Sequence, residues 1–227
     1  TMIVINYWSG DTKIYYLFLV FFFLILILTI GHSIDIYFSG LFYYKENQFL
    51  LQSYYDITIF FRKIVLRAII IYILILPIIS LWLPISQLYF NFKFNLKEIL
   101  FIWSTSFINV LIIVNLLLKN LWGRARPGDV LELGGKESFS PWFQISDSCS
   151  TNCSFVSGDA AVGFSIIALY FITKNKFYLW SSLVLGASLG MIRIMEGGHF
   201  LSDVVMSAAI IYFAYFLQTK FFYKRYD

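Results

Sequence analysis

The chain has 227 residues, of which 59% are hydrophobic, 21% are aromatic and only 13% are charged, and its mean hydropathy is +0.76. Soluble domains carry roughly 25% charged residues, so this composition excludes an ordinary water-soluble globule and indicates a polytopic membrane protein. The net charge of +4 is small and the basic residues are scattered, which argues against a nucleic acid as a partner.

Six apolar runs divide the chain, and each approaches the roughly 20 residues that a membrane-spanning helix needs. They predict an all-α fold in which a single domain, residues 1–227, is a bundle of six transmembrane helices. We expect the spans at about 14–30, 64–83, 100–118, 157–172, 177–191 and 200–217. Residues 35–62 mix aromatic and charged side chains, so we expect this stretch to lie along the membrane surface.

The orientation in the membrane follows from short basic loops. With an even number of spans both termini lie on one side, and the basic residues are nearly equal in number on the two sides. The tight turn that contains Lys174 and Lys176 favours the cytoplasmic side by the positive-inside rule. We therefore expect both termini to be cytoplasmic.

Three polar groups interrupt the apolar sequence. The first, residues 119–127, directly follows the third predicted span, and the second, residues 157–159, opens the fourth. The third group, residues 193–203, lies between the fifth and the sixth spans. Counting crossings puts all three on the membrane face opposite the termini, so we expect them to form one site.

The basic residues of these groups indicate an anion site. Lys119, Arg126 and Arg193 would place three uncompensated cations beside hydrocarbon, which is costly unless an anion completes the site. An arginine fork binds two phosphate oxygens at once and a lysine adds a point charge. Ser157 and Gly158 precede a helix, whose free N–H groups and dipole favour an anion.

An imidazole beside this anion site indicates phosphoryl transfer. His199 and Asp203 are four residues apart at the start of a predicted helix, and so share one face. The carboxylate can orient one ring nitrogen and leave the other free to attack phosphorus. We expect no metal and no other cofactor, because the guanidinium and ammonium groups can neutralise the developing charge.

The combined pattern Lys-x6-Arg-Pro, then Ser-Gly, then Arg-x5-His-x3-Asp resembles the three-part signature of the type 2 phosphatidic acid phosphatase (PAP2) superfamily. The resemblance implies a six-helix membrane fold and metal-independent dephosphorylation through a phosphohistidine on His199, which Asp203 orients. It also implies that the phosphate is held by Lys119, Arg126, Ser157, Gly158 and Arg193.

Two local strings narrow the resemblance. Residues 122–127 and 153–160 are similar to bacterial lipid A 1- and 4′-phosphatases. This implies a lipid phosphate substrate taken from the bilayer, a bacterial inner-membrane location with a periplasmic site, and a role in lipopolysaccharide modification. Membrane lipids are then the expected partners, and we expect no obligate protein partner.

The sequence departs from the superfamily pattern at two positions. The middle motif usually carries a histidine as general acid where this chain has Asp159, and Ile192 stands where a serine usually precedes the arginine. Our hypothesis is that Asp159 donates the proton to the leaving alcohol. Nearby cations oppose this role because they favour the ionised carboxylate, whereas burial or a bound phosphate dianion favours it.

The long loop between the first and second groups contains both cysteines. Outside the cytoplasm, we expect Cys149 and Cys153 to form a disulfide that tethers the segment before Ser157. A zinc site is improbable because the sequence offers no further ligands nearby. Beside the first motif, Arg124 is expected to be a surface or headgroup contact, and we assign no chemistry to Glu196.

Other functions stay open at this point. Ser157, His199 and Asp203 would suit an intramembrane serine hydrolase or acyltransferase, although the Gly-x-Ser-x-Gly elbow is absent and the cations would have no task. A non-enzymatic anion channel or lipid-binding protein would explain the cations but not the His–Asp pair. Among phosphatase substrates, phosphatidylglycerophosphate and undecaprenyl pyrophosphate are alternatives to lipid A.

Overall fold

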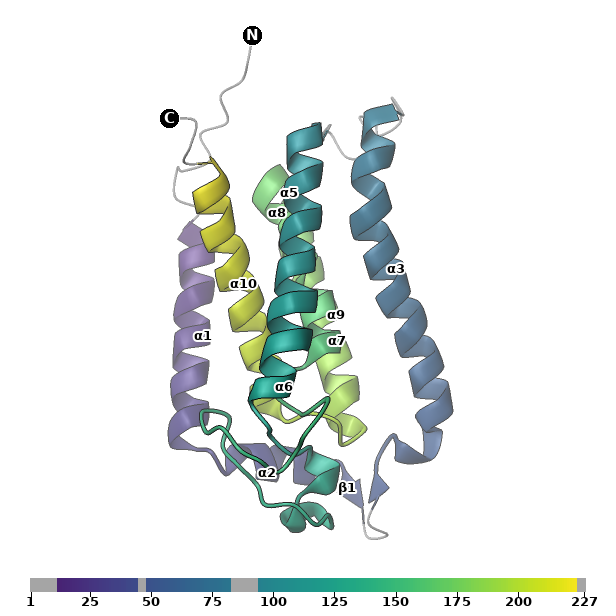
Figure 1. Cartoon of the computed structure of the whole chain (residues 1–227), viewed down its shortest axis with the longest axis vertical. Coiled ribbons are helices and arrows are strands. Elements are labelled where there is room, and N and C mark those ends of the chain that lie inside the picture. Colours follow the sequence, from purple (N-terminus) through teal and green to yellow (C-terminus); the bar gives the residue numbers. More distant parts are fainter. Residues whose placement is uncertain (1–11, 45–47, 83–93, 224–227) are drawn as a thin grey trace.

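The computed structural model describes residues 12–44, 48–82 and 94–223, which form a helical bundle (Figure 1). The bundle axis is followed by α1 (Thr12–Ile30), α3 (Tyr55–Trp82), α9 (Lys176–Met195) and α10 (Leu201–Tyr223). It is also followed by α5 (Leu96–Ser106), which continues through the π-helical η2 (Phe107–Leu118) into α6 (Lys119–Leu121). The predominance of helix agrees with the predicted fold class.

The outer surface of the bundle is apolar. Large hydrophobic side chains on most of the long helices are exposed, among them Phe22, Ile71, Leu116, Val184 and Phe213, each at least half exposed. A soluble protein rarely exposes apolar patches of this extent, and a hydrocarbon environment covers them without cost. The chain is therefore a membrane protein.

The described helices differ in whether their length and hydropathy are sufficient to cross a membrane. Three of them, Leu96–Leu121, Lys176–Met195 and Leu201–Phe222, are long and apolar enough to cross a membrane. The helices Ile14–Ile30 and Ile34–Gly40 meet at a bend of 92°, and they make a fourth span if the two are counted as one. The segment Gly158–Thr173 is apolar but shorter. The predicted six spans thus exceed those that length and hydropathy indicate in the described part of the chain.

The centre of the bundle is formed by α7 (Gly158–Phe164) and α8 (Ile167–Thr173). A helix that is apolar on all sides must be buried, and between Ala160 and Ile172 every residue except Val162 is buried. A Cβ atom on Gly163 would lie 2.6 Å from the Cα atom of Gly186 in α9. These two glycines therefore let the backbones of α7 and α9 touch, which fixes the start of α7 relative to α9.

The segment predicted to lie on the membrane surface, residues 35–62, contains a short helix, two short strands and the start of a long helix. The chain bends from α1 into α2 (Ile34–Gly40), which crosses the end of the bundle and leads to the antiparallel strands β1 (Tyr43–Tyr44) and β2 (Gln48–Phe49). After the short helix η1 (Gln52–Tyr54), α3 begins at Tyr55, earlier than expected, and carries Arg62 into the bundle. Leu83, the predicted end of the second span, lies outside the described residues.

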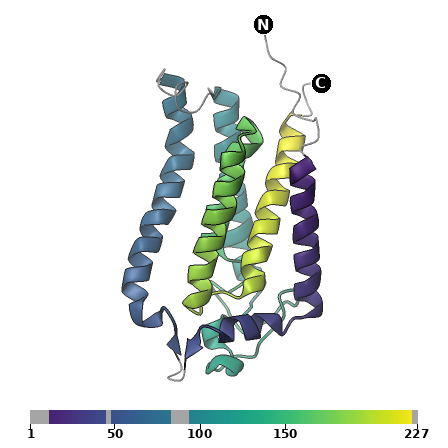
Figure 2. The ribbon, with the colours of Figure 1, turned by 180° about the vertical axis from the view of Figure 1, so that it is seen from behind.

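One end of the bundle collects the irregular segments. The loop of residues 122–157, which contains η3 (Pro127–Asp129) and η4 (Leu131–Leu133), lies there with α2 and the strands (Figure 1). The turn from α9 to α10 reaches the same end, whereas the start of α1 and the end of α10 lie at the opposite end (Figure 2). All three polar groups of the sequence are therefore at one end of the molecule.

Candidate active site

The predicted site residues come from four helices and the turns beside them. Lys119 opens α6, and Arg126 immediately precedes η3. Ser157 precedes α7, whose first two residues are Gly158 and Asp159. Arg193 lies in the last turn of α9, His199 in the following turn and Asp203 in the first turn of α10.

The imidazole of His199 is buried and has a defined orientation. Its Nδ1 lies 2.7 Å from the backbone oxygen of Ser154, and because a carbonyl oxygen only accepts, Nδ1 carries the proton. The nearest carboxylate oxygen, Oδ2 of Asp203, is 3.7 Å from Nδ1, too far for a hydrogen bond. Ser154, which sequence reasoning missed, thus fixes the tautomer and leaves the lone pair on Nε2.

The protonation state of His199 suits a nucleophile. Burial lowers the pKa of the imidazole to about 4, and the charges of Arg193 and Lys119 act in the same direction, whereas Asp203 acts in the opposite one. An imidazole with this pKa is neutral at pH 7. It can therefore present an unprotonated Nε2 to an electrophile.

Asp203 is a fully bonded carboxylate. Its Oδ2 accepts hydrogen bonds from the hydroxyl of Ser154 at 2.5 Å and from the backbone N–H of Phe200 at 2.8 Å. Its Oδ1 accepts one from Nη1 of Arg124 at 2.6 Å. The carboxylate therefore holds Ser154 and the start of α10 in place, so it acts on His199 mainly through Ser154.

Arg124 is buried rather than at the surface, and our expectation for this residue was wrong. Its side chain is 0% exposed, and its guanidinium lies 4.3 Å from the ring centre of Phe200. Besides Asp203 it donates to Asp35 of α2 at 2.8 Å and to the hydroxyl of Ser202 at 2.8 Å. The residue numbers of Asp35 and Asp203 differ from that of Arg124 by 89 and 79, so local sequence gave no sign of these partners.

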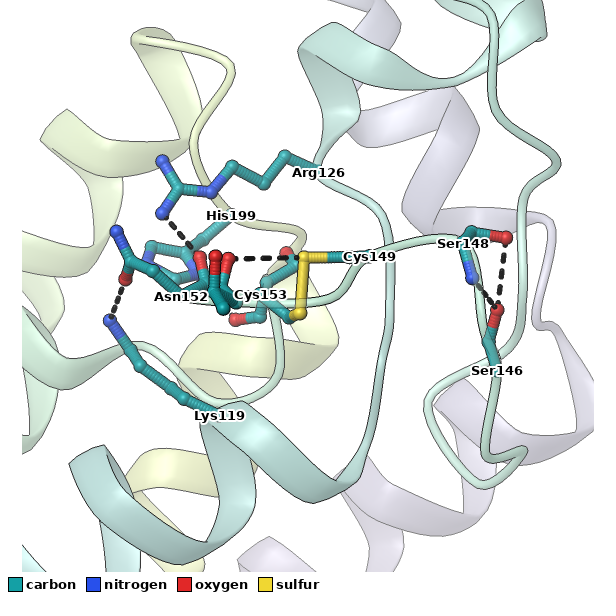
Figure 3. The surroundings of a disulfide bond; sticks show 10 residues. Lys119, Arg126, Ser146, Ser148, Cys149, Asn152, Cys153 and His199 are labelled. Carbon is teal, nitrogen blue, oxygen red and sulfur yellow. Dashed lines mark hydrogen bonds between the residues drawn. A yellow bond between two sulfur atoms is a disulfide. The ribbon is translucent and has the colours of Figure 1, made fainter.

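The two cations of the first motif meet the same residue. Nζ of Lys119 donates to the side-chain oxygen of Asn152 at 3.2 Å, and Nη2 of Arg126 donates to the backbone oxygen of Asn152 at 2.6 Å. Figure 3 shows both bonds in front of His199. In this structure the sulfur atoms of Cys149 and Cys153 are joined in a disulfide that closes the loop bearing Asn152.

The third predicted cation belongs to a separate group of charges. Arg193 donates to Glu196 at 2.5 Å, and its Nε lies 3.6 Å from the carboxylate of Asp159. Asp159 also pairs with Arg62 of α3, whose Nη2 lies 3.9 Å from Glu196. Sequence reasoning missed Arg62, because residues 35–62 were expected on the membrane surface. The available signal was a basic residue just ahead of an apolar run.

Several buried polar atoms at this end have no hydrogen-bond partner among the described residues. They include the hydroxyl of Ser157 and Nε of both Arg62 and Arg193. Buried donors are rarely left unpaired, so such a set indicates a missing acceptor. Phosphate oxygens would supply that acceptor, since they bind hydroxyl and guanidinium donors.

The position of Gly158 allows a close approach between two motifs. A Cβ atom there would lie 2.6 Å from the side-chain oxygen of Asn115 and 3.4 Å from Cε of Lys119. A side chain at this position would therefore displace the side chain of Asn115, while the contact with Lys119 is at ordinary van der Waals distance. Gly158 thus packs against the end of η2 and the start of α6.

A cavity of about 350 Å³ adjoins these residues. Two of the predicted phosphate-binding side chains, those of Arg126 and Arg193, form part of its wall together with Glu196. The rest of the wall comes from β2, η1, the 3-10 turns and the α9–α10 turn, through Phe49, Gln52, Gly128, Asp129, Leu133, Gly134, Gly197 and Gly198. Its size and polar wall suit a hydrophilic headgroup better than an acyl chain.

Comparison with known proteins identifies the family of this chain. Residues 99–227 match the family model of the PAP2 superfamily. The chain is 34% identical over 198 residues to the lipid A 4′-phosphatase of Francisella tularensis subsp. novicida, covering 85% of this chain and 88% of that protein. The chain therefore belongs to the PAP2 superfamily, which confirms the resemblance seen in its motifs.

Two further relatives match a smaller share of the chain. The lipid A 4′-phosphatase of Rhizobium leguminosarum is 34% identical over 116 residues, covering 49% of this chain and 50% of that protein. The lipid A 4′-phosphatase of Rhizobium etli is 35% identical over 112 residues, covering 47% and 44%. No solved structure matches the chain.

Arg124→Ala is expected to lower the free energy of unfolding by about 3–5 kcal/mol, because it leaves two buried carboxylates without their cation. Thermal unfolding of the purified protein in detergent measures this loss. Arg126→Ala is the matched control, since this side chain lies two positions further on and is partly exposed; it should leave the melting temperature unchanged. Equal melting temperatures for wild type and Arg124→Ala would refute the role of the buried network.

The imidazole of His199 is expected to titrate near pH 4. Because the pKa in the folded protein lies below the value of about 6.5 in an unfolded chain, stability is lost as the pH falls from about 6.5 toward 4. Nitrogen-15 NMR of the labelled protein in micelles reports the titration directly, with His32→Gln to remove the other histidine signal. A midpoint near 6.5 would contradict the buried, proton-donating arrangement at Nδ1.

Proposed function

We propose that this protein is a lipid A phosphatase that removes one phosphate, most consistently the 4′-phosphate, from lipid A in a membrane. The observation that carries the proposal is the 34% identity over 85% of the chain to a protein named lipid A 4′-phosphatase. The two shorter relatives carry the same name. The site adds the chemical support, since a neutral buried imidazole lies beside predicted phosphate-binding cations.

In the proposed mechanism, Nε2 of His199 attacks phosphorus and the bond from phosphorus to the sugar oxygen breaks. The phosphate is held by Lys119, Arg126, Arg193, the Ser157 hydroxyl and the backbone at Gly158, whose positive charge and donors stabilise the developing charge. Water then hydrolyses the phosphohistidine and releases inorganic phosphate. Ser154 and Asp203 keep the imidazole in the tautomer whose Nε2 can attack. The proposed mechanism uses no metal or other cofactor.

The sugar hydroxyl that leaves needs a proton, and we assign its donation to Asp159. In the structure this carboxylate pairs with Arg62 and lies 3.6 Å from Arg193. A phosphate dianion that binds Arg193 would compensate this charge, and the carboxylate could then take up a proton. Asp159 would thus become an acid only when the substrate is in place.

For the membrane arrangement, we propose six spans: α1, α3, α5 to α6, α7 to α8, α9 and α10. The site would face the periplasm from the inner membrane of a bacterium, with cytoplasmic termini. Two observations support this orientation. The described ends of the chain lie at the end of the bundle opposite the site (Figure 1), and a disulfide near the site suits an oxidising compartment.

The purified protein in detergent is expected to convert bisphosphorylated lipid A to the monophosphate, with fragmentation mass spectrometry locating the loss at the 4′ position. His199→Ala should lower the rate by at least ~10³-fold and abolish an acid-labile phosphoenzyme. Ser157→Ala should leave residual rate, whereas a serine hydrolase would lose all activity. Unchanged lipid A, while phosphatidylglycerophosphate or undecaprenyl pyrophosphate loses phosphate, would refute the substrate assignment.

Asp159→Asn is expected to lower kcat for lipid A by about 10²- to 10⁴-fold, the usual contribution of a positioned acid. An aryl phosphate, whose leaving group needs no proton, should lose much less in the same variant. Rates for both substrates with wild type and variant give the comparison. Equal losses for the two substrates would show that Asp159 only positions Arg62 and Arg193.

A further inference from the structure

The loop of residues 149–153 is closed at its base by the Cys149–Cys153 disulfide, with Cα atoms 5.6 Å apart. Cys153 is buried and its N–H lies 3.4 Å from the backbone oxygen of Lys119, so the end of the loop is attached to the first motif. Asn152, in contrast, is exposed and precedes Cys153 directly. The loop therefore presents Asn152 from a fixed base.

Asn152 brings the two cations of the first motif to one point. Its side-chain oxygen accepts from Lys119 and its backbone oxygen accepts from Arg126, at 3.2 and 2.6 Å (Figure 3). Lys119 and Arg126 lie on different segments, the start of α6 and the extended residue before η3. A shared acceptor between them sets the position of both side chains.

The residue type fits this task for two reasons. Asn152 has φ of 51°, a left-handed conformation that glycine, asparagine and aspartate adopt more readily than other residues. Glycine has no side-chain oxygen for Lys119, and aspartate would add a charge that competes with phosphate. The asparagine side chain accepts from Lys119 without neutralising it, while the backbone oxygen accepts from Arg126.

The same segment also holds the nucleophile. Ser154, the second residue after Asn152, accepts from Nδ1 of His199 and donates to Asp203. Cys153, at which the disulfide closes the loop, therefore lies between Asn152, which places the phosphate-binding cations, and Ser154, which places the imidazole. Moving Cys153 would disturb both sets of contacts together.

We propose that Asn152 is a positioning residue for the phosphate site, and that the Cys149–Cys153 disulfide keeps it in place. The proposal rests on the proposed function, since the site it serves is the phosphate site of that enzyme. In wild type, the loop holds Lys119 and Arg126 ready for the phosphate; without the disulfide, the two side chains lose their common acceptor.

Inorganic phosphate binding to the purified full-length chain, followed by calorimetry, tests the proposal without turnover. Asn152→Gly keeps the left-handed backbone and removes the bond to Lys119, so the dissociation constant should rise about 10-fold. Asn152→Asp adds a carboxylate beside both cations and should raise it on the order of 10²-fold. Ser150→Ala, an exposed change in the same loop, is the control that should leave it unchanged.

The role of the disulfide is measured in the same assay. Reduction of wild type by a phosphine should weaken phosphate binding about 10-fold, and reduction should weaken binding to Asn152→Gly less, because this variant has already lost the bond to Lys119 and keeps only the backbone bond to Arg126. With lipid A as substrate, Asn152→Gly should raise KM more than it lowers kcat. A change that only loosened the fold would lower the melting temperature and reduce the active fraction without this split.

The proposal is overturned if phosphate affinity is the same in wild type, Asn152→Asp and the reduced protein, or if Ser150→Ala weakens it as much as Asn152→Gly does. Failure of the proposed function gives a different result. Wild type would then bind inorganic phosphate in the manner described but release no phosphate from lipid A.

Discussion

The buried guanidinium of Arg124 is the contact on which the arrangement of this end of the molecule depends. An unpaired charge in an apolar interior costs several kcal/mol, so a buried arginine is tolerated only where carboxylates and carbonyls receive its donors. Asp35, Asp203 and the backbone oxygen of Ser140 do so here. Because these acceptors belong to α2, α10 and the long loop, one side chain fixes three segments that are remote in sequence. The orientation of His199 follows, since Asp203 bonds to Ser154 and Ser154 to the imidazole.

Two arginines of one motif therefore have opposite tasks. Arg124 is buried and its donors are bonded to protein groups, so its charge is compensated by carboxylates of the fold. Arg126, two positions further along, reaches the wall of the cavity and the loop that bears Asn152. Composition alone cannot distinguish the two, because both are arginines beside the same apolar span.

The sequence predicted those features that depend on spacing along the chain. The predicted runs 14–30 and 177–191 correspond closely to α1 and α9, and all three polar groups lie at one end of the bundle. The sequence did not predict contacts between residues that lie far apart along the chain. Asp35 meets Ser202 across 167 positions, and Arg62 meets Asp159 across 97. The bond from His199 to Ser154 uses a backbone oxygen, which every residue possesses, so no pattern of side chains could have indicated it.

The balance of charge around the predicted phosphate site gives a physical reason for an aspartate where the superfamily usually has a histidine. Arg62 adds a fourth basic side chain beside Lys119, Arg126 and Arg193, and the carboxylates of Asp159 and Glu196 lie beside Arg62 and Arg193. A histidine at position 159 would remove this negative charge and leave Glu196 as the carboxylate bonded to Arg193 and near Arg62, so the repulsion between the two arginines would be less compensated. Arg62 and Asp159 thus form a pair, and in the proposed mechanism the incoming phosphate would compete with Asp159 for Arg62.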